Sequence, residues 1–348
     1  MLIGSDTRVL TESESEQGVS KQFYLSQFPF PIFFITIVPN PILAIPFAPP
    51  WLSPRSLPRT LLRTREVVFM AWISLIPLAL ISLWGLSLWR LLCSSSSSRS
   101  VFLSNGSGKR RNVLLVVAHP DDESMFFAPT ILFLVSKGHN LHILCMSLGN
   151  ADGMGNIRKE EFYRACAVLK VVIFFNGFSL PLGIISLTTL QVPLEHIKVL
   201  DHPNLQDGFD KKWDHQLLAG LIEDQIKMWD IDSVITFDNF GVSGHPNHRD
   251  VHHGICKLLH GNSQRKIEAW ELVSVNIFRK YSGPVDIWLS TLLSLSYDKQ
   301  HICCLRNSNP RRSYDAMAQH ESQWVWFRKL FILLSSYTYI NMLRKVKI

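Results

Sequence analysis

The hydrophobic and polar positions follow different patterns in the two parts of the chain. Residues 67–89 are uncharged throughout, and Glu66 and Arg90 stand at the edges of this run. About 20 apolar residues suffice for a helix to cross the hydrocarbon core of a membrane, so the run predicts one transmembrane helix. From Asn112 onward, short runs rich in Val, Ile and Leu alternate with amphipathic stretches. This alternation predicts an α/β fold, in which a mostly parallel sheet carries helices on both faces.

Periodicity places the individual elements of the α/β part. Buried parallel strands are short continuous apolar runs, whereas amphipathic helices repeat their apolar positions every three to four residues. We therefore expect strands at residues 113–117, 141–147, 197–200, 233–237 and 272–277, and helices at 126–136, 158–169, 213–229 and 248–260.

Composition divides the chain into five parts. We expect a poorly defined N-terminal extension at 1–66, a transmembrane anchor at 67–92, a Ser-rich tether at 93–111, a catalytic domain at 112–305, and a basic and aromatic C-terminal segment at 306–348. Prolines recur through the apolar part of the extension and would break a spanning helix. The extension is either an organellar transit peptide or an over-extended start. We favour a start at Met70, which stands near the head of the apolar run.

Charge and cysteine content indicate the cellular compartment of the α/β part. If translation starts at Met70, the basic residues that flank the anchor, Arg90 first, lie only on its C-terminal side. The positive-inside rule then predicts that residues 90–348 face the cytosol. None of the six cysteines forms a Cys-x-x-Cys pair, and a domain of this size needs no disulfides. A reducing compartment is the simplest expectation.

The arrangement of the basic residues indicates a membrane surface as the binding partner more than a nucleic acid. The net charge is +7, and the densest basic region is the segment 306–348, where Arg and Lys mix with Trp and Phe. That mixture suits an anionic membrane surface, and an ordinary solvated helix face remains an open alternative. The basic residues do not follow a groove with interleaved aromatic residues, so we expect no nucleic-acid partner. The sequence identifies no protein partner.

A dense group of charged residues follows the first expected strand directly. The sequence there reads His119-Pro120-Asp121-Asp122-Glu123. Ligands bind beyond the carboxyl ends of the strands in open α/β sheets, and acids crowded beside a buried strand need a compensating charge. Histidine nitrogen and aspartate oxygen together are a donor set typical of zinc sites. The alternative is an acidic helix N-terminus that complements the helix dipole.

A second polar group follows the fourth expected strand. The sequence from Ser243 to His248 reads Ser-Gly-His-Pro-Asn-His, and its glycine lets the backbone approach a ligand closely. His245 and His248 are three residues apart where this loop becomes a helix. One of them could complete a metal site begun by His119 and Asp122, and the other could face a substrate. We expect His252 and His253, further along the helix, to be ordinary residues.

The two motifs resemble those of the LmbE-like de-N-acetylases, in the branch of the phosphatidylinositol-glycan class L proteins. Residues 149–153, 201–203 and 322–328 also match, and the resemblance covers about residues 71–348. It implies a Rossmann-like catalytic domain behind one N-terminal transmembrane helix. It also implies an enzyme of glycosylphosphatidylinositol-anchor biosynthesis on the cytosolic face of the endoplasmic reticulum membrane. Such an enzyme hydrolyses N-acetylglucosaminyl-phosphatidylinositol, a glycolipid, to glucosaminyl-phosphatidylinositol and acetate.

The resemblance also implies roles for individual residues. It makes His119, Asp122 and His248 the ligands of a divalent metal, with zinc the expected ion. Asp121 becomes the general base, and His245 becomes the group that stabilises the oxyanion or protonates the leaving amine. Asn150, Asp152 and Arg158 are candidates for contacts with the sugar or the phosphate, and Glu123 is expected to support the site from behind.

One stretch departs from the family pattern. Residues 171–191 are uncharged and interrupt a connection that should be short. They are a membrane-dipping loop, a second spanning helix or a retained intron. We favour the intron, because a second span would split one α/β domain across the bilayer, and because Val171 and Leu190-Gln191 are compatible with splice-site dinucleotides.

Three other functions are alternatives to this enzyme. An LmbE-like deacetylase of another N-acetylglucosamine conjugate would not need the anchor at 67–92. A metal phosphoesterase often holds two metals and needs more ligands than the sequence offers. A catalytically dead membrane-bound scaffold would not need to keep every residue of the metal motif.

Overall fold

The computed structural model describes residues 59–93, 110–170, 196–261, 267–296 and 301–347. The chain divides into two compact units, Met1–Val68 and Phe69–Ile348, and the second unit holds the whole α/β fold. The apolar insert expected at 171–191, most of the N-terminal extension and most of the Ser-rich tether lie outside the described residues.

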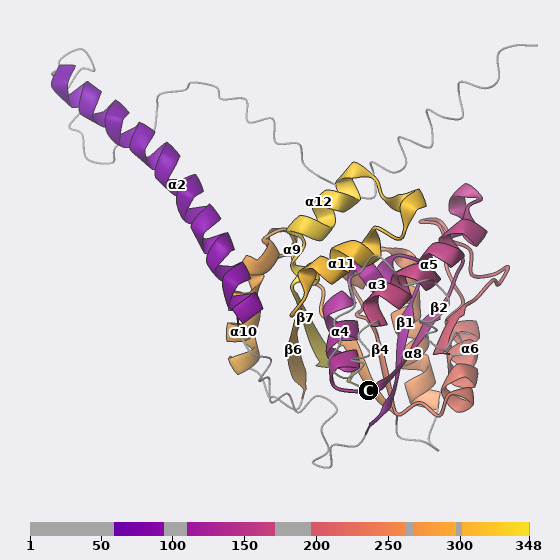
Figure 1. Cartoon of the computed structure of the whole chain (residues 1–348). Helices are drawn as coiled ribbons and strands as arrows, with labels where there is room; N and C mark the ends of the chain where they lie inside the picture. Colours follow the sequence, from indigo (N-terminus) through magenta and orange to yellow (C-terminus); the bar gives the residue numbers. More distant parts are fainter. Residues whose placement is uncertain (1–58, 94–109, 171–195, 262–266, 297–300, 348) are drawn as a thin grey trace, which may run out of the picture. The chain divides into compact units, whose positions relative to one another are not determined.

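One sheet of seven strands forms the centre of the second unit (Figure 1). Its spatial order is β3-β2-β1-β4-β5-β7-β6. The strands are β1 (Asn112–Val117), β2 (Asn140–Cys145), β3 (Ile197–Val199), β4 (Ser233–Phe237), β5 (Glu268–Leu272), β6 (Ile302–Arg306) and β7 (Ile340–Lys345). The first five run parallel, and β7 pairs antiparallel with both β5 and β6. This confirms the expected α/β class with a mostly parallel sheet.

Helices cover both faces of the sheet. On one side α4 (Ala128–Ser136), α5 (Gly155–Lys170) and α11 (Pro310–Met317) pack together, and on the other α6 (His215–Met228) packs on α8 (Pro246–Gly261). Right-handed crossovers between parallel strands produce this division, because β1-α4-β2 moves outward in one direction and β4-α8-β5 in the other. The carboxyl ends of β1 and β4, which are hydrogen-bonded neighbours, therefore lie side by side.

The expected strand at residues 272–277 is wrong. The strand is β5, and the chain leaves the sheet after Leu272 to begin α9 (Ile277–Lys280). Two buried or half-buried acids, Glu268 and Glu271, concealed the strand in the sequence. Their charges are balanced by β7, where Lys345 bonds Glu268 at 3.0 Å and Arg344 bonds Glu271 at 2.7 Å.

The C-terminal residues are built into the sheet. The segment expected as a separate basic and aromatic part supplies α11, α12 (Trp326–Leu334) and β7. Strand β7 lies between β5 and β6, and two of its basic residues pair with acids of β5. The sequence could not place this strand, because its partners lie far away along the chain.

The apolar N-terminal run forms α2 (Arg59–Cys93). Within the described residues, Leu75–Cys93 is the one helical stretch long and apolar enough to cross a membrane. The end of α2 packs on the α/β domain, where buried Leu91 contacts Ile287 of α10 (Asp286–Ser296) and Tyr339. Trp288 also donates its indole N–H to Ser87 at 2.8 Å.

Candidate active site

The loop after β1 places a histidine and two carboxylates in a buried turn. Asp121 has a φ of 139°, a conformation that is costly for a residue with a side chain. The carboxylate of Asp122 stabilises the turn, since its Oδ2 accepts from the backbone N–H groups of Ala118 at 3.0 Å and His119 at 2.8 Å. The side chains of His119, Asp121 and Asp122 are all buried. The sequence motif is therefore a rigid loop at the sheet edge.

The loop after β4 brings two further histidines to the same place. His248 lies in the first turn of α8, stacked on the ring of Phe237 at a centroid distance of 4.1 Å. Its Nδ1 lies 3.1 Å from the carbonyl oxygen of Gly241, which can only accept a hydrogen bond. Nδ1 is therefore the donor to Gly241, and Nε2 faces Asp122 Oδ1, 3.2 Å away.

Ligand atoms from the two loops converge tightly enough to hold a metal ion. Atoms of His119, His245 and His248 all lie within 4.8 Å of one another. Asp122 joins this group, with Oδ2 3.9 Å from His119 Nδ1. Buried Nδ1 of His245 has no hydrogen-bond partner. These nitrogen and oxygen donors fit a divalent cation of the zinc type, and they contain the expected set His119, Asp122 and His248.

Two arginines hold the carboxylate of Asp121. Arg328 of α12 donates from Nη1 to Asp121 Oδ2 at 2.5 Å, and Arg158 Nη2 lies 3.9 Å from the same oxygen. Arg158 also donates to the carbonyl oxygens of Gly149 at 2.6 Å and Pro120 at 3.2 Å. Arg158 was an expected site residue. Arg328 was noted only as part of the matching tail, and its contact with Asp121 links residues too distant for sequence patterns to pair.

Asp207 is a site residue that the sequence analysis missed. Its Oδ1 lies 3.1 Å from His119 Nε2, and its Oδ2 lies 3.2 Å from Arg158 Nη1. Burial alone would raise the pKa of the Asp207 carboxyl, but the adjacent His119 and Arg158 hold it well below its usual range. The loop that carries it has no hydrophobic periodicity, so no local signal separates Asp207 from the acids around it.

The pKa values of His245 and Asp122 are both shifted from their usual ranges. Burial lowers the pKa of His245 to about 2, and the neighbouring imidazoles of His119 and His248 act in the same direction. His245 is therefore neutral at physiological pH. For Asp122 burial acts in the opposite direction, but His248 outweighs it and lowers the pKa to about 2. Asp122 is therefore a carboxylate and a competent metal ligand.

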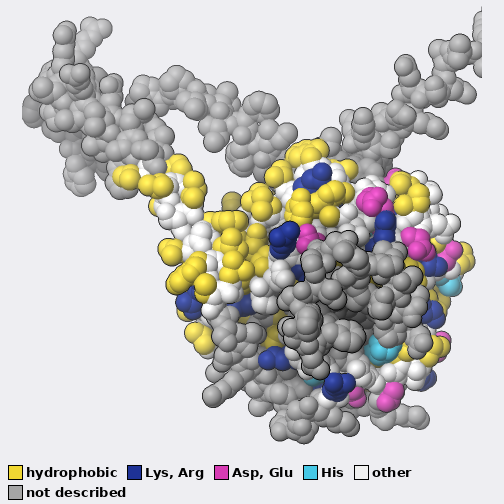
Figure 2. All heavy atoms as spheres, in the orientation of Figure 1, with side chains coloured by type: hydrophobic (Ala, Val, Ile, Leu, Met, Phe, Trp, Pro, Cys, Tyr) yellow, Lys and Arg dark blue, Asp and Glu magenta, His cyan; other side chains and the backbone are white. Residues whose placement is uncertain are grey.

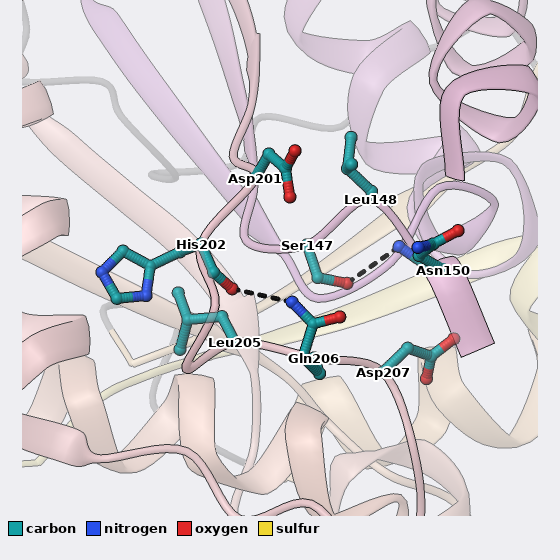
Figure 3. A pocket seen from close by; sticks show the side chains of 9 residues that line it. Ser147, Leu148, Asn150, Asp201, His202, Leu205, Gln206 and Asp207 are labelled. Atoms are coloured by element: carbon teal, nitrogen blue, oxygen red, sulfur yellow. Dashed lines mark hydrogen bonds between the residues drawn. The ribbon is translucent and has the colours of Figure 1, made fainter. Parts of the chain in front are cut away.

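A small polar hollow lies beside Asp207, the residue that contacts His119 (Figure 3). Asn150, His202, Gln206 and Asp207 contribute to its lining, and Gln206 donates to the His202 carbonyl at 3.0 Å. The expected substrate residue Asn150 thus lines the pocket, and Arg158 reaches it through Asp207. Asp152 is exposed in the short helix η2 (Asn150–Asp152) and does not line this pocket.

Two other residues have supporting positions. Glu123 is fully buried behind the loop, where its Oε1 lies 2.7 Å from His320 Nε2 and accepts from Ser124 Oγ at 2.5 Å. His252 lies on α8, with Nδ1 3.1 Å from the Phe237 carbonyl oxygen. Glu123 therefore braces the first motif from behind, and His252 stays outside the histidine group.

Comparison with known proteins places this chain among deacetylases. The PIG-L family, described as GlcNAc-PI de-N-acetylase, matches residues 114–259. A Schizosaccharomyces pombe protein named probable N-acetylglucosaminyl-phosphatidylinositol de-N-acetylase is 35% identical, covering 73% of this chain and 96% of the relative. The Bos taurus protein of that name, without "probable", is 35% identical, covering 68% and 84%. Among solved structures, the N,N'-diacetylchitobiose deacetylase of Pyrococcus horikoshii is 15% identical, with a TM-score of 0.43, covering 76% of this chain and 92% of that one.

The length and identity of these matches define the chain as an enzyme of the de-N-acetylase class, hydrolases that remove an acetyl group from nitrogen. Within that class it belongs to the PIG-L family. The family resemblance drawn from the His119 and His245 motifs is thereby confirmed.

Proposed function

We propose that this enzyme hydrolyses the N-acetyl group of N-acetylglucosaminyl-phosphatidylinositol, giving glucosaminyl-phosphatidylinositol and acetate in glycosylphosphatidylinositol-anchor biosynthesis. The names of the relatives support this substrate. The observation that carries the chemistry is the convergence of His119, Asp122 and His248 beside Asp121, at the carboxyl ends of two neighbouring parallel strands.

His119, Asp122 and His248 would hold a divalent metal, with zinc the ion that suits two imidazoles and a carboxylate. Such an ion supplies Lewis acidity, which activates water and polarises an amide carbonyl. Each ligand is pre-oriented by the chain. The Gly241 carbonyl orients His248, backbone N–H groups hold Asp122, and Asp207 lies against the far nitrogen of His119.

Asp121 is the general base of the proposed reaction. Arg328 fixes its carboxylate at the edge of the ligand group, within the rigid turn that also carries Asp122. A carboxylate held in this way accepts a proton from the attacking water and can return it to the amine nitrogen as the C–N bond breaks. This transfer balances the reaction, since water supplies the acetate oxygen and both the protons that are needed.

His245 stabilises the oxyanion. Its pKa of about 2 makes it a neutral imidazole, which donates an N–H hydrogen bond but does not carry a spare proton at neutral pH. Of the two roles implied by the resemblance, this favours the oxyanion-stabilising one. A fixed donor in a buried site is worth more than the same donor in water.

The polar residues around the hollow of Figure 3 are the proposed contacts for the sugar. Carboxylate and amide groups such as Asp207 and Asn150 are suited to sugar hydroxyls, because they accept or donate hydrogen bonds at defined angles. Arg158 fixes one wall, since it contacts both Asp207 and the Gly149 carbonyl. Asp152, exposed in η2, would meet a substrate only at the edge of this pocket.

The proposed location is the endoplasmic reticulum membrane, with the α/β domain in the cytosol. Helix α2 supplies the anchor over Leu75–Cys93. With a start at Met70, the basic residues at and after its end, such as Arg90, Arg110 and Arg111, favour the cytosolic side under the positive-inside rule. An anchor that ends on the α/β domain suits a substrate that stays in the bilayer.

A comparison of two substrates and two variants tests this function. The full chain, reconstituted in phosphatidylcholine vesicles, should release acetate from N-acetylglucosaminyl-phosphatidylinositol. His119→Ala should abolish this release while circular dichroism stays unchanged, and His253→Ala, which alters a half-buried histidine outside the ligand group, should keep it. Acetate release only from a soluble N-acetylglucosamine conjugate would show that the substrate is that conjugate and not the lipid. No release by the folded protein would favour a scaffold.

A further inference from the structure

Helix α12 has one face buried in the domain and one exposed apolar face. Its inward face carries Arg328, Phe331 and Ile332, all buried. Its outward face carries Trp326, Leu330 and Leu333, which stand at the i, i+4, i+7 spacing of one helical stripe and are all exposed. Trp326 alone exposes 63% of its surface. A short helix with an apolar stripe on its outer side needs an apolar partner.

Helix α9 extends this apolar surface. Ile277 and Phe278 are both exposed, and Phe278 is 85% exposed, a high value for a phenylalanine. The residue that follows α9, Tyr281, meets Phe331 of α12 edge to face at 6.1 Å. The two helices are therefore neighbours. We call the exposed group Ile277, Phe278, Trp326, Leu330 and Leu333 the α9–α12 rim.

The rim adjoins the apolar anchor helix. Gly283 lies just after α9 with a φ of +59°, and a Cβ added there would come within 2.9 Å of Trp84 Nε1 on α2. The same Cβ would lie 3.6 Å from the carbonyl oxygen of Leu334, the last residue of α12. Figure 2 shows hydrophobic side chains gathered over α12 and along α2 and α10. The rim is thus continuous with the helix proposed to cross the bilayer.

The inner sides of the same helices reach the active site. Arg328 of α12 bonds the proposed base Asp121, and Lys280 of α9 donates to the Val242 carbonyl oxygen at 2.7 Å, in the loop that precedes His245. The rim therefore lies on the opposite side of α9 and α12 from the loops that carry Asp121 and His245. A lipid substrate approaching from the membrane would meet the rim first.

We infer that the α9–α12 rim inserts into the lipid bilayer beside α2 and holds the catalytic loops at the membrane surface, so that the glycolipid reaches the site without leaving the bilayer. This inference rests on the proposed function. The tryptophans of this region fit the interfacial position that they prefer in membrane proteins. Exposed basic Lys329 on α12 adds attraction to anionic lipid headgroups.

Photocrosslinking tests the insertion directly. Benzoylphenylalanine replaces Phe278 in the full chain, reconstituted in vesicles of phosphatidylcholine and phosphatidylethanolamine. Two matched positions serve as controls. Leu80 of α2 is 61% exposed and belongs to the proposed span, and Met228 of α6 is 67% exposed and lies away from the rim. After illumination, mass spectrometry of the peptides should find phospholipid adducts at positions 278 and 80, about tenfold more than at 228.

Kinetics supply the second readout. The double variant Phe278→Ser with Leu330→Ser should raise the KM for N-acetylglucosaminyl-phosphatidylinositol in vesicles about tenfold, because it removes apolar surface from the membrane contact. The same variant should leave kcat/KM unchanged on a water-soluble N-acetylglucosaminyl-inositol phosphate, which also shows that it is folded. Met228→Ser should change neither value.

The possible outcomes distinguish a failure of this inference from a failure of the proposed function. Lipid adducts at position 80 but none at position 278 would contradict insertion of the rim into the bilayer. Crosslinks from position 278 to a second copy of the chain would also contradict it. So would an equal loss on both substrates. Absence of lipid adducts at position 80 would overturn the anchor itself, and absence of acetate release by the unaltered protein would overturn the proposed function.

Discussion

Arg328 donates from Nη1 to Oδ2 of Asp121 at 2.5 Å, although the two residues are 207 positions apart. The same nitrogen donates to Gln323, whose side-chain amide donates to the Pro120 carbonyl oxygen at 2.9 Å. The tail of the chain therefore closes over the loop that carries Asp121. It holds the strained backbone of Asp121 in place and orients the carboxylate.

This contact predicts a large loss of activity when Arg328 is changed. Arg328→Gln should lower kcat about 100-fold, because a misplacement of the base by about 1 Å has an effect of that size. The matched control is Lys329→Gln, an exposed neighbour on the same helix, which should keep kcat. Steady-state acetate release measures both. An unchanged kcat in Arg328→Gln would show that the base needs no such support.

We predict that Asp207 affects both substrate binding and metal binding by His119. Asp207→Asn keeps the shape of the side chain but loses the charge that faces His119 and Arg158. We expect KM to rise and metal affinity to fall about 10- to 100-fold, the usual effect of losing a partner of a metal ligand. Asp210→Asn changes an exposed acid in the same loop and should change neither value. Identical metal affinity in Asp207→Asn and the unaltered enzyme would contradict this role.

Gly283 is predicted to control the attachment of α2 to the domain. Gly283→Ala places a methyl group against Trp84 and puts alanine in a left-handed conformation, which costs about 1–2 kcal/mol. The attachment should loosen, and limited proteolysis should cut the tether after α2 faster. Gly85→Ala is the control, since nothing lies within 4 Å of a Cβ at that position. Equal cleavage rates in the two variants would refute the close contact.

His248 is predicted to be required for metal binding. Alanine at this position removes the imidazole that faces Asp122 at 3.2 Å. Metal content, measured by plasma mass spectrometry on purified protein, should fall from one ion per chain to a trace. His253→Ala, one turn further along α8, should retain the ion. Full occupancy in His248→Ala would place the metal among other ligands.

The parts of the fold that depend on local pattern were predictable. Strands β1 and β4 are continuous buried runs, and the polar motifs follow each of them directly, so their convergence follows from parallel pairing. Strand β5 was misplaced because Glu268 and Glu271 interrupt its apolar pattern and are balanced only by β7. Asp207 and Arg328 meet the site through long-range contacts, which leave no periodic signal in the sequence.

Two expectations stay predictions. The individual roles of His119, Asp121, Asp122, His245 and His248, which the family resemblance implies, stay to be tested by substitution. The retained-intron interpretation of residues 171–191 lies outside the described part of the chain. Sequencing the transcript tests it, and a dominant message that encodes these residues would refute it.

Acetate release from N-acetylglucosaminyl-phosphatidylinositol before and after metal removal tests the central claim most directly. The full chain in phosphatidylcholine vesicles is treated with a chelator, freed of it, and then supplied with zinc. The account predicts release by the untreated enzyme, loss of release after chelation, and recovery with zinc in the unaltered chain but not in Asp121→Asn. Undiminished release from the metal-free protein would contradict it.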